Sequence, residues 1–407
     1  MKICIHRGTQ EIGGTCVEIA HDGSRIAIDL GLPLHAETNG PEWLPPVAGL
    51  TQPADDFLGI VISHPHQDHY GLLAHVHETV PIAMGQAARR ILTAASRFVP
   101  GPTVQLGNLE LRDRRLLSLG PFSITPFMVD HSAYDAYSLL IEAGGQRVFY
   151  SGDFRGHGRK AALFERLVAA PPTAIDCLML EGTSIARLDA DANFATESEL
   201  EQQFVAAFKR ISGLAMVFAS GQNIDRLVTL YRAALKTGRV LILDLYTAEV
   251  LAATENERLP QGHWENVRVI IPRSQSRQAT ETEDLFKRHR CINWATLHEL
   301  GPNAVMLCRS SMLKQLAATG NLEGAQAIYS MWDGYLQDGK LQAQLDGLSI
   351  PLTQIHTSGH ADTPTLKRLT AALNPKAVTP IHSKHPEMYE SLFPNVVARS
   401  DGEWWSV

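Results

Sequence analysis

Four side chains of the kind that bind metal ions lie within the segment "ISHPHQDHYG", residues 62–71: His64, His66, Asp68 and His69. Imidazole and carboxylate groups are costly to bury together unless something pairs with them. Imidazole nitrogen and carboxylate oxygen are also the ligands that suit zinc. Because a surface turn would be an unusual place for such an accumulation, the segment predicts a metal site.

The candidate partners of this cluster share one placement in the sequence. Each follows a segment with the pattern of a β-strand, and strand ends on one edge of a sheet converge, so that distant residues can line one cleft. The residues placed in this way are Asp29, His64, His131, Asp153, Glu181, His360 and His382.

The spacing within the cluster indicates two ions rather than one. His64 and His66, two positions apart at a strand exit, can point at one ion, while the next two residues can face a second. Two ions about 3.5–4 Å apart need more ligands than one loop supplies. A lone histidine is usually an ordinary one, and an aspartate in "SGD" can be a turn residue or a helix cap. The cluster makes candidates of three later residues: His131, Asp153 and His382.

The pattern along the 407 residues changes twice. The first part reads as short strands punctuated by glycine, with a hairpin turn at "HDGS" and helices over residues 71–80 and 86–99. From about residue 196 the chain reads as strand, helix and strand of a parallel sheet, and near residue 350 the first style returns. We therefore expect one domain over residues 1–192 and 346–407, interrupted by another over residues 193–345.

The amino-acid composition limits the kinds of protein that this chain can be. A net charge of −7 leaves no overall electrostatic footprint for nucleic acid, so a polyanion would need a locally positive cleft. The five cysteines are scattered and form no CxxC pair, which favours a reducing, cytoplasmic location. No apolar run approaches the roughly 20 residues that span a bilayer, so we expect no membrane partner.

The motif His64-x-His66-x-Asp68-His69-x-Gly71 resembles the signature of the metallo-β-lactamase superfamily. Three further segments resemble motifs A, B and C of its β-CASP subfamily of nucleases, which includes ribonuclease J and the nuclease subunit of the mRNA 3′-end cleavage factor. These segments are "LMLEGTS" with Glu181, "TSGHAD" with His360 and "VTPIHS" with His382. The resemblance implies an α/β fold: a metallo-β-lactamase αββα sandwich with an inserted Rossmann-like β-CASP domain.

The resemblance also implies roles for the candidates. One Zn²⁺ would be held by His64, His66, His131 and Asp153, and the other by Asp68, His69, Asp153 and His382. Mn²⁺ is an alternative, because such ligand sets accept both ions. Asp29 would orient a ligand histidine from outside. A hydroxide activated by the two ions would attack phosphorus, with Asp68, His360 and Glu181 as the further catalytic residues.

The resemblance favours RNA as the substrate, because His382 stands where the DNA-repair branch of the subfamily has valine. We expect the RNA to be single-stranded, since a duplex would not pass between the close walls of a cleft. Helix N-termini suit phosphate, and one is expected after the strand that ends near Ser220, where a plain helix cap is the alternative. The candidate substrate-binding residues are Ser220, Asn223, Arg226, Ser358, Gly359 and Ser383.

Several alternatives stay open at this point. The same scaffold could carry a DNA nuclease, a small-molecule hydrolase of lactones or thioesters, or a non-catalytic RNA-binding subunit. A zinc-dependent ribonuclease is the reading that the motifs favour. A homodimer is also open, because a strand ending in "EWWSV" would place Trp404 and Trp405 on opposite faces, one of them exposed.

Overall fold

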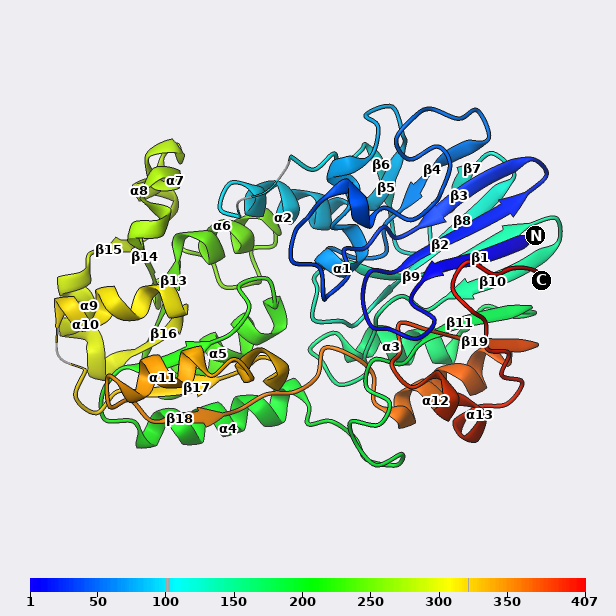
Figure 1. Ribbon diagram of the computed structural model, residues 1–407. Helices are drawn as coiled ribbons and strands as arrows, with labels where there is room; N and C mark the ends of the chain where they lie inside the picture. Colours follow the sequence, from blue (N-terminus) through cyan, green and yellow to red (C-terminus); the bar gives the residue numbers. More distant parts are fainter. Residues whose placement is uncertain (100, 102, 321) are drawn as a thin grey trace. The chain divides into compact units, whose positions relative to one another are not determined.

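The computed structural model describes residues 1–99, 101, 103–320 and 322–407. The chain divides into two compact units (Figure 1). Unit 1 comprises residues 1–92, 100–194 and 359–407, and unit 2 comprises residues 93–99 and 195–358. Each unit is described by itself.

Unit 1 contains two sheets. The first has the spatial order β20 (Trp404–Ser406), β1 (Lys2–Arg7), β2 (Cys16–His21), β3 (Ser24–Ile28), β4 (Phe57–Val61), β5 (Ile82–Gly85) and β6 (Leu109–Leu111). The second has the order β19 (Ala377–Ile381), β11 (Cys177–Glu181), β10 (Gln146–Tyr150), β9 (Ala136–Ala143), β8 (Phe122–Val129) and β7 (Leu117–Leu119). The last segment of the chain thus supplies an edge strand to each sheet.

Among the described residues, three hydrophobic cores define the layers of unit 1. A central core joins the inner faces of both sheets, with Ile3 and Ile28 from the first and Ile124 and Ile141 from the second. Two outer cores bury the other faces, one under helices and one under loops and short helices. The helical elements of unit 1 are η1 (Pro41–Trp43), α1 (Gln67–Tyr70), η2 (Leu73–His75), α2 (Gln86–Ser96), α3 (Ala161–Ala169), α12 (Thr363–Leu373), η7 (Pro386–Met388) and α13 (Tyr389–Leu392). The result is the αββα sandwich, as predicted.

Unit 2 is built on one parallel sheet. Its spatial order is β15 (Cys291–Ile292), β14 (Val267–Ile270), β13 (Val240–Asp244), β16 (Ala304–Cys308), β12 (Ala215–Phe218), β17 (Gln326–Tyr329) and β18 (Leu352–Gln354). Its helical elements are α4 (Glu197–Arg210), α5 (Ile224–Lys236), α6 (Leu245–Ala253), η3 (Arg273–Gln275), α7 (Ser276–Glu281), α8 (Leu285–Arg288), α9 (Trp294–Leu300), η4 (Gly301–Asn303), η5 (Ser310–Met312), α10 (Leu313–Thr319), η6 (Asp333–Leu336) and α11 (Lys340–Asp346). Crossover helices between parallel strands are the pattern that the sequence indicated.

The predictions for individual elements of unit 1 concern a hairpin turn, the last strand and a helix. The turn of the hairpin between β2 and β3 is made by Asp22 and Gly23, both with positive φ, as two-residue hairpin turns require. In β20, Trp404 is exposed and Trp405 is buried, as alternation predicts. The helix predicted over residues 71–80 is wrong, because only η2 forms there. The amide of His77 donates to the carbonyl of Leu50 instead of continuing the turn. Among the helices of the described ranges, none has the length and apolar character needed to cross a lipid bilayer.

Candidate metal centre

Unit 1 gathers the predicted ligands at the carboxyl ends of its strands. Residues 29, 64, 131, 153 and 382 follow β3, β4, β8, β10 and β19, Glu181 ends β11, and His360 precedes α12. Within the part of the chain that the structure describes, three groups of side chains have ligand atoms within 4.8 Å of one another. They are His64, His66, His131 and Asp153; Asp68, His69 and His382; and Asp153, Glu181, His360 and His382.

Distances in the first group match the spacing of ligands around one ion. The His131 Nε2 atom lies 3.2 Å from His66 Nδ1, and His64 Nε2 lies 3.5 Å from an Asp153 carboxylate oxygen. Tetrahedral bonds of about 2.0–2.1 Å place ligand atoms roughly 3.3 Å apart. The first group therefore has the dimensions of one cation site.

The second group is adjacent to the first, and Asp153 of the first group lies against it. His382 Nε2 lies 3.2 Å from Asp68 Oδ2, and His69 Nε2 lies 3.9 Å from the same oxygen. His69 Nε2 is also 3.2 Å from Asp153 Oδ2, the oxygen that faces His64. Asp153 thus lies between the two groups.

Buried atoms without hydrogen bonds show that the centre fits a cation. His64 Nε2, His69 Nε2 and both carboxylate oxygens of Asp153 are buried and make no hydrogen bond within the described residues. Buried polar atoms are rarely left unsatisfied, and each such atom needs a physical explanation. Ligand atoms awaiting a divalent cation provide that explanation, and the donor set of nitrogen and carboxylate oxygen suits it.

Asp29 supports the centre from outside. Its carboxylate accepts hydrogen bonds from His69 Nδ1 at 2.7 Å and from the Tyr150 hydroxyl at 2.7 Å. It also accepts from the amide and the hydroxyl of Ser63, at 2.7 and 2.8 Å. The bond to Nδ1 turns the other ring nitrogen of His69 toward the ligand group, the role that the resemblance implied.

The local electrostatics keep the three imidazoles of the first group uncharged, so that their nitrogen lone pairs can bind a metal ion. Burial lowers the pKa of His64 and His131, helped by neighbouring histidines, and it lowers the pKa of His66 to about 4. Burial alone would raise the pKa of Asp68, but His69 and His382 outweigh it and the pKa is lowered. Neutral imidazoles beside an ionised carboxylate are the protonation states that a metal requires.

Glu181 lies in hydrogen-bonding contact with His360. Its carboxylate accepts from the amides of Phe154 and Thr183, at 3.1 and 3.2 Å, and His360 Nδ1 lies 3.2 Å from it. Burial would lower the pKa of His360, but the charges of Glu181 and Asp153 raise it. His360 is therefore oriented beside the ligand groups, with a charged form that its neighbours favour.

The predicted substrate-binding residues are dispersed between the two units. In unit 2, Ser220 is exposed, whereas Asn223 caps α5 by accepting from the amide of Arg226 at 3.1 Å. The Arg226 guanidinium is fully buried and donates to Glu197 at 3.0 Å, so its side chain faces the interior of unit 2. Ser358 is buried as well.

In unit 1, Gly359 and Ser383 lie against the centre. A Cβ at Gly359 would overlap the Ser132 hydroxyl and lie 3.8 Å from His131, so the backbone approaches the ligand loop closely. Ser383 is fully buried, and its hydroxyl donates to the carbonyl of Gly182. Ser383 therefore supports the structure of the loop beside His382.

Three residues of the centre were missed in the sequence. Ser63, Tyr150 and Thr183 each contact a ligand or Asp29 through a hydroxyl group. Each lies within three residues of a predicted site residue, and this neighbourhood was the only signal available. Hydroxyl groups are too common next to strand ends for that signal to identify them.

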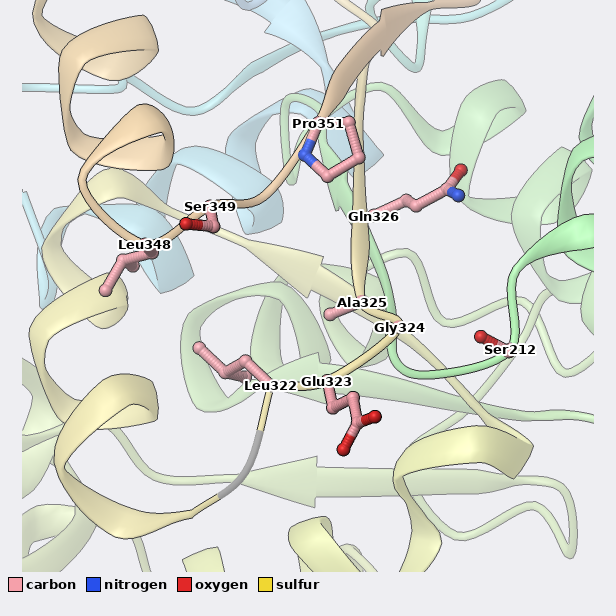
Figure 2. A pocket seen from close by; sticks show the side chains of 9 residues that line it. All are labelled: Ser212, Leu322, Glu323, Gly324, Ala325, Gln326, Leu348, Ser349 and Pro351. Carbon is pink, nitrogen blue, oxygen red and sulfur yellow. The ribbon is translucent and has the colours of Figure 1, made fainter.

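A separate hollow lies in unit 2, at the amino ends of β12, β17 and β18 (Figure 2). It measures about 390 Å³ and is lined by Ser212, Leu322, Glu323, Gly324, Ala325, Gln326, Leu348, Ser349 and Pro351. Glu323 is its one ionisable lining residue, so the hollow offers no ligand set comparable to the metal centre.

Comparisons with known proteins agree with this geometry. Residues 24–219 match the family model described as "Beta-lactamase superfamily domain". Ribonuclease J 1 of Streptococcus pyogenes serotype M3 is 22% identical over 402 residues, which cover 93% of this chain and 68% of that protein. Ribonuclease J of Helicobacter pylori strain B128 is 23% identical over 416 residues, covering 95% and 56%.

Two further comparisons define the limits of the likeness. The match to Ribonuclease J of Mycobacterium tuberculosis strain CDC 1551 / Oshkosh is 23% identical and covers 59% of this chain and 43% of that protein. The chain thus spans less than half to about two thirds of the length of these relatives. A crystal structure of a protein of unknown function from Enterococcus faecalis V583 covers 99% of both chains with a TM-score of 0.79 at 20% identity, and shares the fold.

Proposed function

The chain belongs to the metallo-β-lactamase superfamily and is ribonuclease J-like, and from this premise we propose that it is a metal-dependent nuclease that hydrolyses RNA phosphodiester bonds. The observation that carries the proposal is the pair of adjacent ligand groups, with Asp153 of the first in contact with His69 of the second and His360 oriented beside them by Glu181. Phosphodiester hydrolysis needs an activated water, charge neutralisation at phosphorus and a proton for the leaving oxygen. The centre has a group for each requirement.

Seven residues would hold two divalent cations, with Zn²⁺ favoured by the nitrogen ligands and Mn²⁺ as the alternative: His64, His66, Asp68, His69, His131, Asp153 and His382. When bound, such ions bring the pKa of water toward ~7 and offset the charge that develops on the phosphate. The protein's own contribution is to keep the imidazoles of His64, His66 and His131 neutral by burial. Neighbouring histidines keep the carboxylates of Asp68 and Asp153 ionised.

His360 is the residue proposed to act directly on the substrate. Its ring lies at the edge of both ligand groups, 5.1 Å from the His131 ring and 5.9 Å from the His382 ring between centroids. Because Glu181 and Asp153 favour its charged form, it can stabilise a phosphate oxygen or donate a proton to the leaving oxygen. Glu181 positions it through the Nδ1 contact.

The support for RNA as substrate is of two kinds. The curated relatives carry the name ribonuclease J, and the position of motif C holds His382, as in the RNA-processing branch that the sequence resembles. The proposed substrate is single-stranded RNA. Ser220 in unit 2 and the backbone at Gly359 in unit 1 remain candidate contacts, whereas the buried side chain of Arg226 does not.

The proposal is tested with purified protein and matched RNA and DNA oligomers labelled at the 5′ end. We expect cleavage of RNA, loss of cleavage with EDTA and recovery with Zn²⁺ or Mn²⁺. Asp68→Asn and His360→Ala should each lower kcat at least about 10²-fold. The matched control is His385→Ala, because the half-buried His385 ring contacts Glu387 rather than either ligand group. Preferential cleavage of DNA, or turnover of lactones or thioesters with RNA intact, would overturn the choice of substrate.

A further inference from the structure

The loop after β11 brings one hydroxyl group against a proposed metal ligand. Thr183 is 4% exposed, and its Oγ1 atom lies 2.8 Å from His382 Nδ1. The same hydroxyl lies 3.3 Å from the carbonyl oxygen of His382, to which only a donor can bond. One hydroxyl therefore contacts both the ring and the backbone of a single histidine.

The number of hydrogen atoms in this contact limits which atom donates and which atom accepts. A hydroxyl carries one hydrogen, and a neutral imidazole carries one N–H. If the Thr183 hydroxyl donates to the carbonyl of His382, its oxygen must accept from Nδ1–H. The other ring nitrogen, Nε2, then has a free lone pair, and this is the atom that lies 3.2 Å from Asp68 Oδ2 in the second ligand group.

The same arrangement recurs in the first ligand group. The Ser63 hydroxyl donates to Asp29 at 2.8 Å, so its oxygen is free to accept from His64 Nδ1, which lies 3.0 Å away. That bond leaves His64 Nε2 as the free nitrogen, and His64 Nε2 is one of the buried atoms without a hydrogen bond. In each ligand group, one hydroxyl thus contacts the Nδ1 atom of one histidine.

We propose that Thr183 is a positioning residue for the second cation, which selects the Nδ1–H tautomer of His382 and so presents Nε2 as the ligand atom. The inference rests on the metal centre of the proposed function but not on the choice of substrate. Which nitrogen of a metal-binding histidine is free is set by the hydrogen bond that the other makes.

The surroundings of Thr183 anchor the backbone that carries its hydroxyl. Its amide donates to Glu181 at 3.2 Å. A Cβ at Gly182 would overlap the Tyr389 hydroxyl, which donates to the carbonyl of Leu180, so the loop is packed where only glycine fits. On the other side, the amide of His382 donates to the carbonyl of Gly8 at 2.7 Å. The backbones of both partners are therefore held at this contact.

Three substitutions test the role of the hydroxyl. Thr183→Val keeps the shape but removes the acceptor, Thr183→Ser keeps the acceptor, and Thr379→Val removes a buried hydroxyl of β19 that lies 3.6 Å from Cys177 Sγ rather than against a ligand. The measurement is the affinity of each protein for Zn²⁺, determined by competition with a chelator. We expect Thr183→Val to bind one of its two ions about 10- to 100-fold more weakly. Thr183→Ser and the control should stay within a few-fold of the wild type.

A second readout separates tautomer selection from general damage. In the metal-loaded protein with ¹⁵N-labelled histidine, the His382 signals, assigned by their loss in His382→Ala, should show a protonated Nδ1 in the wild type and in Thr183→Ser. The unfolding transition of metal-free Thr183→Val, compared with that of the metal-free wild type, shows whether the variant is folded.

Wild-type affinity of Thr183→Val for both ions would overturn the proposal, as would a wild-type His382 that carries its proton on Nε2. A wild type that binds fewer than two ions would overturn it too. A wild type that binds two ions but leaves RNA intact would refute the proposed substrate alone.

Discussion

Asp29 is the residue on which both ligand groups depend. It accepts from His69 of the second group directly, and from Ser63, whose hydroxyl contacts His64 of the first. Its φ of 58° lies in the left-handed region, which asparagine tolerates as well as aspartate does. The carboxylate, rather than the backbone conformation, is therefore what a substitution to asparagine removes.

Asp29→Asn should weaken metal binding without unfolding unit 1. An amide has one accepting oxygen, so its NH₂ group would face a donor in either orientation. In the place of Oδ1 it would face the Ser63 amide, and in the place of Oδ2 it would face His69 Nδ1–H and the Tyr150 hydroxyl. We expect a 10- to 100-fold lower affinity for at least one ion, measured by calorimetric titration of the metal-free protein. Tyr150→Phe removes one of the four donors to Asp29 and should have the smaller effect. Equal metal binding by Asp29→Asn and wild type would contradict the role given to Asp29.

Glu181→Gln should change the pH dependence of the proposed activity. Glu181 and Asp153 raise the pKa of His360, so removing the charge at position 181 lowers that pKa. If protonated His360 assists the reaction, activity is lost as pH rises through this pKa. The alkaline limb of the kcat profile should therefore move to lower pH, with kcat reduced about 10²-fold at pH 8.

The profile of kcat against pH, taken from pH 5.5 to 9 on one RNA oligomer, checks this expectation. His360→Ala serves as the reference, because it should lose the limb altogether. An alkaline limb at the same pH in Glu181→Gln and wild type would show that His360 does not act through the protonation state that Glu181 favours.

At the scale of elements, unit 2 is held together by a buried ion pair between two helices. Arg226 of α5 donates to Glu197 of α4 at 3.0 Å, and also to the carbonyl and hydroxyl of Ser330 after β17. Thr229 donates to Glu197 as well, at 2.6 Å. Arg226 is fully buried and Glu197 is 1% exposed, so removing either partner would leave an uncompensated charge in the interior.

Arg226→Met should therefore act on stability rather than on substrate. We expect the free energy of unfolding to fall by about 3–5 kcal/mol, measured by urea denaturation of the metal-loaded protein. At temperatures where the variant remains folded, its KM for RNA should match the wild type. The matched control is Arg232→Met on the same helix, since the Arg232 side chain is 54% exposed and its loss should cost at most about 1 kcal/mol. A higher KM with unchanged stability would restore Arg226 as a substrate contact.

The contrast between Asp153 and Arg226 shows what the sequence could and could not reveal. Asp153 follows a strand with a clear pattern, and the geometry of sheets places such strand ends together, so its neighbours were predictable. Arg226 lies at the start of α5, where an exposed cation and a buried one look alike in sequence. Its partner Glu197 is on another helix, and nothing in the pattern of α4 marks that carboxylate as buried.

The hydroxyls of Ser63 and Thr183 were hidden for a related reason. Their importance arises from distances of about 3 Å to particular ring nitrogens, which depend on side-chain rotamers rather than on element type. The prediction of a helix over residues 71–80 was wrong for another reason, because the amide of His77 donates to the carbonyl of Leu50. Patterns predict elements and their ends, whereas hydrogen-bond partners distant in sequence decide the details.

At the scale of the whole chain, every proposed metal ligand lies in unit 1. The ligands come from all three of its segments, and residues 359–407 supply His382 together with β19 and β20. Unit 2 has its own core around the sheet from β15 to β18. Cations bound in both ligand groups would therefore tie together three stretches of unit 1, and they would do so without a ligand from residues 195–358.

Metal removal should accordingly loosen unit 1 selectively. A ligand that binds only the folded state stabilises it by about 4 kcal/mol at a concentration 1,000 times its Kd, and removing it makes local opening easier. After treatment with EDTA, hydrogen exchange measured by mass spectrometry should rise in peptides covering the loops after β4, β8, β10 and β19. Peptides from β12, β13 and β16 should exchange as before, because their hydrogen bonds and core depend on no ligand. Adding Zn²⁺ should restore the protection. Equal increases in both units would mean that the cations stabilise the chain through residues other than the seven proposed, because those residues connect only the strands of unit 1.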